Sequence, residues 1–189
     1  MKTLELSEIA NIADYELGRQ ALRPRMIALK DRRRVRVGPH LTLLFENRET
    51  VRYQIQEMMR IERITELDAI RHEVETYNEL VPAPGELSAS LLIEYESPEE
   101  RDVALRDLLG LENHLWIEVD GQPPSRARFD DRQISSDRLS SVQYVKFPLT
   151  AAQCAQWERG ARIVVDHPKY RFTQPLTPEQ LHELGQDFR

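Results

Sequence analysis

The residues best suited to chemistry lie at one junction, where an apolar strand passes into a helix. Glu46-Asn47-Arg48-Glu49 occupies that junction. Bare backbone amides at such a place often bind phosphate, but two carboxylates there argue against an anion. A cation, or a salt bridge between Glu46 and Arg48 or Arg52, fits the charges better. The simpler alternative is that these residues only cap the helix and form weak surface ion pairs.

Glu62 stands out on the helix that follows. At about 100° per residue, the apolar side chains form one arc of this helix, and Gln54 and Glu62 fall inside it. The arc consists of Val51, Ile55, Met58, Met59 and Ile61. A carboxylate on a core-facing arc is costly unless it is paired. We therefore expect Glu62 to form an ion pair with an arginine, or else to bind a metal or a substrate.

One ligand-binding hypothesis joins these side chains to a histidine from the preceding turn. Its residues are His40, Glu46, Asn47, Arg48, Gln54, Glu57 and Glu62. No catalytic residue or cofactor is predicted, because the chain has no glycine-rich phosphate loop, nucleophile elbow or His-Glu-x-x-His helix. The single cysteine, Cys154, cannot form a disulfide or a thiolate metal cluster within one chain.

A basic stripe precedes the junction. A helix is expected up to about Lys30. If residues 31–37 are extended, Lys30, Arg32, Arg34 and Arg36 share one face of a strand. Such a stripe could bind an acidic partner, a phosphate or, through Arg32–Arg36, a nucleic-acid backbone. The alternative is a solvated edge strand that its charges protect from pairing with other chains. The net charge of −6 makes general attraction to nucleic acid unexpected.

A strand and two helices must position these residues. Apolar side chains alternate along 41–46, which predicts a largely buried strand. Asn47 suits the N-cap of a helix that reaches about Ile64. An apolar stripe from Leu67 to Val81 predicts a second helix over 65–80, packed on the first as a hairpin. Pro82-Ala83-Pro84-Gly85 then ends the helical part.

Beyond this break, the residue period becomes that of strands. Strands are expected at 88–95, 115–119, 142–147, 163–166 and 170–173, and Asp120-Gly121 predicts a hairpin with 125–129. Short helices should begin at Ser97, Thr150 and Thr177, which are good N-caps. The polar stretch 130–141 is expected to be a mobile loop and the segment best able to close over a ligand.

Together these elements predict a single α+β domain over residues 1–189. Residues 1–81 should form a mainly helical layer with a strand pair near 32–46, and residues 86–189 the sheet-rich part. Short turns favour a mostly antiparallel sheet, packed against a central helical hairpin that covers one side of it with residues 47–80. Short additional helices complete the fold.

The composition is that of an ordinary globular protein, with 40% hydrophobic and 31% charged residues. The first residues are polar and carry no export signal. No apolar run approaches the roughly 20 residues that span a bilayer. We therefore expect a soluble, cytoplasmic protein with no membrane partner.

The block RRRVRVGPHLTLLFENRETVRYQIQEMMRIER, residues 32–63, carries a family resemblance. It resembles the central block of an uncharacterised bacterial family that is known only as a domain of unknown function and whose members have about this length. Members are often encoded near rubrerythrin-like proteins and cysteine-rich iron–sulfur oxidoreductases. The resemblance implies a redox or oxidative-stress context and supplies no activity, catalytic residue or cofactor.

Three functions are compatible with these observations. The first is a non-enzymatic accessory or binding protein, with a protein partner from a redox system. The second is a metal- or small-ligand-binding enzyme with a site near Glu46, Arg48 and Glu62. The third is nucleic-acid binding through Arg32–Arg36. The sequence leaves the oligomeric state open.

Overall fold

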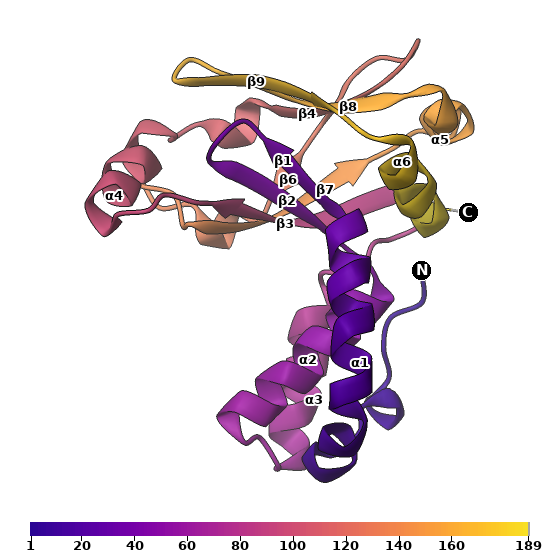
Figure 1. The fold of residues 1–189 in the computed structure, drawn as a ribbon. Coiled ribbons are helices and arrows are strands. Elements are labelled where there is room, and N and C mark those ends of the chain that lie inside the picture. The colour runs from indigo at the N-terminus through magenta and orange to yellow at the C-terminus, as the bar shows by residue number, and fades with distance from the viewer. Residues whose placement is uncertain (189) are drawn as a thin grey trace.

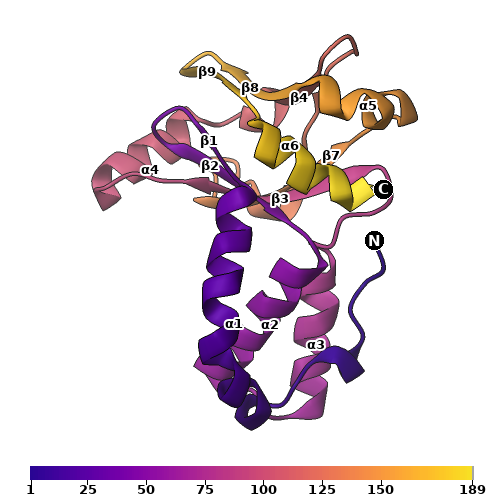
Figure 2. The same cartoon turned by 45° about the vertical axis from the view of Figure 1, so that its right-hand side comes forward.

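The structure is a computed structural model that describes residues 1–188. Within these residues, the long helices of the first half of the chain form a bundle that extends away from the β-sheets (Figure 1). The two chain ends lie near each other, close to the place where the bundle meets the sheets (Figure 2). This combination of helical and antiparallel strand parts confirms the predicted α+β class.

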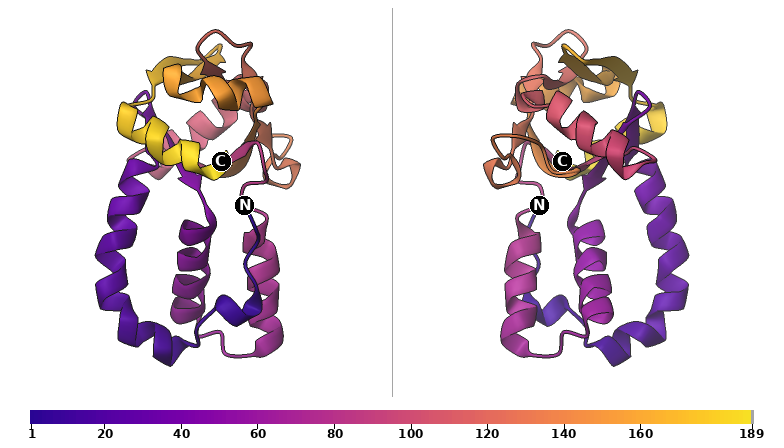
Figure 3. Two further views of the ribbon diagram at one scale, coloured as in Figure 1. Left: turned by 90° about the vertical axis from the view of Figure 1, so that its right-hand side faces the viewer. Right: turned by 90° about the vertical axis from the view of Figure 1, so that its left-hand side faces the viewer.

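The bundle is made by the first half of the chain. Its helices are α1 (Ile12–Arg32), α2 (Arg48–Glu62) and α3 (Leu67–Asn78), with the 3₁₀ turn η1 (Leu6–Glu8) beside them. Figure 3 shows the three helices running alongside one another. The α2–α3 hairpin confirms the prediction, whereas α1 runs without a break through Pro24.

The buried side of α2 differs from the predicted arc. Ile55 is buried, as expected, but Ile61 is 65% exposed and Gln56 is buried. The reason lies in residues 1–10, which pack against α2 and whose place the sequence does not reveal. The Gln56 side chain accepts a hydrogen bond from the Ala10 amide at 2.8 Å and donates one to the Ala10 carbonyl at 3.0 Å. Leu4 packs in the same cluster as Ile55.

Within residues 1–188, nine strands form two sheets, not the single sheet expected from the sequence. The first sheet has the order β1-β2-β3-β7-β6 and the second the order β5-β4-β8-β9, with every pairing antiparallel. The first contains β1 (Arg34–Val37), β2 (Leu41–Glu46), β3 (Glu86–Ile93), β7 (Val142–Pro148) and β6 (Arg128–Phe129). The second contains β5 (Ser125–Arg126), β4 (Leu115–Val119), β8 (Ala161–His167) and β9 (Tyr170–Pro175).

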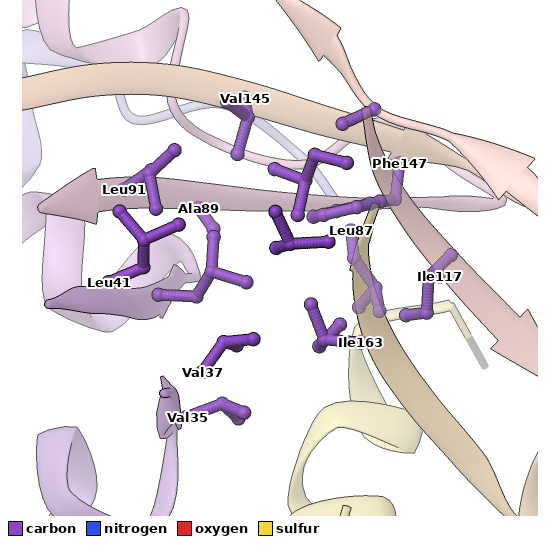
Figure 4. Packing of buried hydrophobic residues seen from close by; sticks show 14 of the residues in the cluster. Val35, Val37, Leu41, Leu87, Ala89, Leu91, Ile117, Val145, Phe147 and Ile163 are labelled. Carbon is purple, nitrogen blue, oxygen red and sulfur yellow. The ribbon is translucent and has the colours of Figure 1, made fainter. Parts of the chain in front are cut away.

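The main core lies between the two sheets. Alternate side chains of both sheets meet there, and Figure 4 shows Leu41 and Leu91 of the first sheet in the same cluster as Ile117 and Ile163 of the second. The helices from Asn47 to Leu80 do not cover this face; they form a separate hydrophobic cluster. The second sheet covers the apolar face of the first sheet, which those helices were expected to cover.

Short helices close the ends of the core. They are α4 (Pro98–Asp107), η2 (Leu111–Asn113), η3 (Asp131–Gln133), α5 (Ala151–Gln156), η4 (Trp157–Arg159), α6 (Pro178–Gly185) and η5 (Gln186–Phe188). Ser97, Thr150 and Thr177 accept N-cap hydrogen bonds, as predicted. Within 130–141, Leu139 reaches the main core, so part of this loop is anchored.

Arg33 is fully buried where α1, β2 and the C-terminal helix meet. Its guanidinium donates to the carbonyl oxygens of Phe45 (2.9 Å) and Glu46 (3.2 Å) and forms ion pairs with Glu183 and Asp187. Five donors on one planar group suit this crowded site. Arg33 therefore links the end of α1 to β2 and to the C-terminal helices.

The basic stripe does not form as predicted. Because α1 continues to Arg32, this residue is helical, and it pairs with Glu183 at 3.1 Å. Arg33 is buried. Of the five residues 32–36, only Arg34 and Arg36 remain basic side chains of the strand.

Candidate functional site

Glu46 and Asn47, at the strand-to-helix junction, stabilise the start of α2 and do not form a shared binding site. Glu46 is 6% exposed, and its carboxylate accepts hydrogen bonds from the hydroxyls of Ser90 (2.8 Å) and Thr50. Asn47 caps α2 by accepting from the amides of Glu49 (3.0 Å) and Thr50 (2.9 Å). The salt bridge expected between Glu46 and Arg48 or Arg52 is therefore replaced by two hydroxyl contacts.

Arg48 points elsewhere, toward the N-terminal segment. It forms an ion pair with Glu8 of η1, and both side chains are about one third exposed. That contact holds the carboxyl pKa of Glu8 below its usual value. Exposed pairs of this kind contribute little to stability. Arg48 thus secures residues 6–8 against the start of α2.

Glu57 belongs to a network between α1 and α2. Its carboxylate accepts from the Tyr15 hydroxyl (2.6 Å), from Arg19 (2.7 and 3.0 Å) and from Arg60 (3.2 Å). The Arg19 hydrogen bonds are the main reason that the pKa of Glu57 falls to about 2. Burial and the same carboxylate raise the pKa of Tyr15. These groups hold α1 against α2, because every polar atom of the carboxylate has a partner.

Glu62 corrects the strongest expectation from the sequence. It is exposed at the end of α2, so it is neither a buried ion-pair partner nor a core-facing ligand. Ile61 beside it is also exposed, whereas Met59 in the same last turn is buried in the bundle, so Ile61 and Glu62 lie on the side of α2 away from the bundle core. Gln54 is half-buried and lies beside Tyr77 of α3. Glu62 and Gln54 therefore do not join Glu46 in one site.

His40 lies at the far end of β2 from Glu46, in the turn before the strand. Its ring stacks on Tyr95, with ring centroids 3.9 Å apart and planes 13° from parallel. The Nδ1 atom lies 3.0 Å from the carbonyl oxygen of Glu94, which can only accept, so Nδ1 carries the proton. Through this contact with Tyr95, His40 lies beside a cavity near α4.

That cavity, the α4 pocket, has a volume of about 470 Å³. This size is in the usual range for small-molecule sites. Its lining residues come from α4, the segment after β3 and the β8–β9 turn. Figure 1 shows α4 at the left end of the sheets. Its lining consists of Tyr95, Glu99, Glu100, Val103, Ala104, Asp107, Leu108, Lys169 and Tyr170. The aromatic and aliphatic members give it an apolar wall with charged groups around it.

Tyr170 fixes one wall of the α4 pocket. Its hydroxyl donates to the carbonyl oxygen of Val37 at 2.6 Å and accepts from the amides of His40 (3.0 Å) and Leu41 (3.2 Å). Gly38 lies between these residues with a φ of 69°, and a Cβ built there would be 2.6 Å from Phe172 Cγ. The β1–β2 turn is thus locked onto β9, and the pocket is built on a rigid base.

The charges around the α4 pocket are mostly negative. Lys169 Nζ forms an ion pair with Asp107 at 2.5 Å. Within residues 1–188, the side chains of Glu99 and Glu100 form no ion pair or hydrogen bond. Both glutamates lie in the first turn of α4, which tolerates negative charge. The pocket therefore presents two uncompensated carboxylates beside an apolar wall.

The phenols of the pocket stay protonated at neutral pH. Burial is the main reason that the pKa of Tyr95 is raised, and the carboxylates of Asp107 and Glu100 add to it. Burial likewise raises the pKa of Tyr170. A protonated phenol is neither a strong nucleophile nor a general base. Both side chains shape the pocket, and the Tyr95 hydroxyl can donate a hydrogen bond, whereas that of Tyr170 is already donated to Val37.

Sequence reasoning missed this pocket because its parts are far apart in the chain. The sequence predicts a strand over 88–95, a helix that begins at Ser97 and strands at 163–166 and 170–173, without placing these elements side by side. The available signal was the polarity of α4, in which exposed Val103 follows Glu99 and Glu100. Nothing local indicated that the β8–β9 turn would lie beside that helix.

Three further findings concern metal binding, thiol reactivity and membrane spans. Among residues 1–188, no three His, Cys, Asp or Glu side chains are grouped so that they could hold a metal ion. Burial raises the pKa of Cys154, which makes its thiol less reactive. In the same part of the chain, no helix has the length and apolar character needed to cross a bilayer.

Comparisons with known proteins agree with the resemblance carried by residues 32–63. A structural neighbour is the crystal structure of a novel protein of unknown function from Burkholderia pseudomallei K96243, with 34% sequence identity, a TM-score of 0.93 and full coverage of both chains. No curated protein matches. The family model described as "Protein of unknown function (DUF3501)" matches residues 3–188. The chain therefore belongs to the DUF3501 family.

Proposed function

We propose that this protein is a non-enzymatic binding protein that holds a small organic cation in the α4 pocket. The observation that carries the proposal is the apolar wall of this pocket beside Glu99 and Glu100, two carboxylates without a basic partner. An apolar body would displace water from Val103 and Leu108, and a protonated amine would gain from the two carboxylates. The ligand class is an amine with an aromatic or aliphatic body.

Binding suits this pocket better than catalysis. Asp107 is engaged by Lys169, and the raised pKa of Tyr95 and of Tyr170 keeps both phenols neutral. A general base should be positioned with a free acceptor near neutral pH. The buried Tyr170 hydroxyl already has three partners. These features support a role in recognition.

A thermal-shift titration tests the proposal with two matched probes, 2-phenylethylamine and 2-phenylethanol. The amine should raise Tm more than the alcohol. A ligand at one hundred times its Kd adds about 2.7 kcal/mol to the free energy of unfolding. For a chain of this size that corresponds to roughly 5–10 °C. Equal shifts for the amine and the alcohol would contradict a cation site.

Variants of the chain test whether the probes bind in the α4 pocket. The double variant Glu99→Gln/Glu100→Gln should lose the preference for the amine, and Ala104→Leu should block both probes by filling the pocket. Glu75→Gln, which removes an exposed carboxylate of α3, is the control and should behave as wild type. An unchanged amine response in the double variant would place the binding elsewhere.

The redox setting is a separate part of the proposal and rests on the family resemblance alone. We propose that the protein is an accessory to a redox or oxidative-stress system and has a protein partner there. Mixing the purified chain with the rubrerythrin-like protein of the same genome, followed by sedimentation velocity, tests this directly. A complex is the expected result, and two independent boundaries over micromolar concentrations would contradict it.

A further inference from the structure

A second hollow region lies between the end of α3 and the outer face of the first sheet. Two adjoining cavities, of about 360 and 320 Å³, share five lining residues there. These residues are Glu79, Leu80, Asp130, Arg132 and Tyr144. We call the two cavities the Tyr144 groove. It shares no lining residue with the α4 pocket.

Two basic side chains lie on neighbouring strands at the bottom of the Tyr144 groove. Arg128 of β6 is the register partner of Lys146 of β7, and both line the larger cavity. Paired residues of an antiparallel sheet place their side chains on one face, with Cβ atoms roughly 5 Å apart. Like charges in that position repel and destabilise the pair. An anion between them would remove this repulsion.

The nearby carboxylates do not neutralise Arg128. Asp130 and Glu79 both pair with Arg132, which ties the 130–141 loop to the end of α3. Glu86 lies 3.1 Å from Lys146 Nζ. Within residues 1–188, Arg128 forms no ion pair or hydrogen bond through its side chain. The guanidinium is thus available to a ligand.

We propose that the Tyr144 groove binds the oxyanion group of a small ligand, a carboxylate or a phosphate, between Arg128 and Lys146. Arginine offers two parallel donors to such a group, and lysine adds a point charge. Phe129, Tyr144 and Leu80 line the same cavity and supply apolar and aromatic contact area for the rest of the ligand. The ligand class is therefore an oxyanion attached to a flat apolar body.

Isothermal titration with benzoate, phenyl phosphate, inorganic phosphate and neutral benzamide tests this inference. Benzoate or phenyl phosphate should bind, benzamide should not, and inorganic phosphate should bind more weakly than phenyl phosphate. Whichever aryl anion binds tighter identifies the oxyanion. Arg128→Gln should weaken that anion at least about tenfold. Arg36→Gln, which removes an exposed arginine of β1 outside the groove, should leave its Kd unchanged.

A second measurement separates a binding role from a structural one. Without ligand, Arg128→Gln should unfold in urea at the same or a higher concentration than wild type, because the substitution removes the repulsion with Lys146. A marked loss of stability would overturn the proposal, since Arg128 would then have a structural partner. Equal binding of benzamide and benzoate, or an unchanged Kd in Arg128→Gln, would overturn it as well.

Discussion

The Tyr170 hydroxyl donates a 2.6 Å hydrogen bond to the carbonyl oxygen of Val37 and so joins the second sheet to the first. The same oxygen accepts from the amides of His40 and Leu41, so one side chain satisfies three backbone groups of the β1–β2 turn. Buried backbone groups without partners are costly. This contact therefore holds the two sheets, and the base of the α4 pocket, in place.

Tyr170→Phe should lower the free energy of unfolding by about 1–3 kcal/mol, the cost of leaving buried polar groups unpaired. Urea denaturation measures it. Tyr53→Phe is the matched control, because within residues 1–188 the Tyr53 hydroxyl makes no hydrogen bond, and it should change stability by less than about 0.5 kcal/mol. Equal effects would mean that the Tyr170 contacts contribute nothing beyond ring packing.

Two glycines should respond to alanine in opposite directions. Gly38→Ala forces a side chain into a φ of 69° and against Phe172, which should cost about 1–3 kcal/mol. Gly18 lies in α1 with no atom within 4 Å of its would-be Cβ, so Gly18→Ala should stabilise by about 0.5–1 kcal/mol. Differential scanning calorimetry of both variants checks the sign of each change. A stabilised Gly38→Ala protein would show that the turn is not locked.

Ile55 and Ile61 test which side of α2 is buried. Ile55 is fully buried in the bundle, and Ile55→Ala should cost about 2–5 kcal/mol. Ile61 is 65% exposed, and Ile61→Ala should stay within about 0.5 kcal/mol of wild type. Urea melts of the two variants give the comparison. Similar losses of stability in both variants would support the buried arc of α2 that the sequence predicts.

Glu57 should make the bundle sensitive to acid. Its pKa falls from 4.5 to about 2 on folding, so its stabilising effect is present above pH 4.5 and is lost as the pH drops toward 2. Since Arg19 and Arg60 are partly exposed, we expect about 2 kcal/mol and not the full Coulombic value. Between pH 5 and 2.5, wild type should lose that much more than Glu57→Gln in urea titrations. Parallel pH profiles of the two proteins would show that the network has no net effect.

Local chemistry predicted the elements well. Asn47, Ser97 and Thr150 each cap the helix they were expected to begin, because an N-cap depends on neighbouring residues only. The alternation along 41–46 correctly predicted a buried strand. Antiparallel pairing followed from short turns. These features are encoded within a few residues of where they occur.

Features that depend on distant segments were not predicted. Gln56 is buried because Ala10 meets it, and Arg33 because Glu183 and Asp187 reach it. The division of strands into two sheets likewise depends on which strands meet, and the residue period does not encode this. The α4 pocket and the Tyr144 groove both form between such segments. Among the expected residues, His40 stacks on Tyr95 of the α4 pocket, and Glu46 is the register partner of Ser88, which lines the Tyr144 groove.

The ion pairs of Arg33 with Glu183 and Asp187 also set an order of events during synthesis. Glu183 and Asp187 follow Arg33 by 150 and 154 residues. At roughly 5–20 residues per second, a ribosome needs about 8–30 s to cover that distance. During this time the guanidinium must stay in water, because burying it without its carboxylates would leave an unpaired charge in the interior. The joint between the bundle and the sheets can therefore close only after α6 has been made.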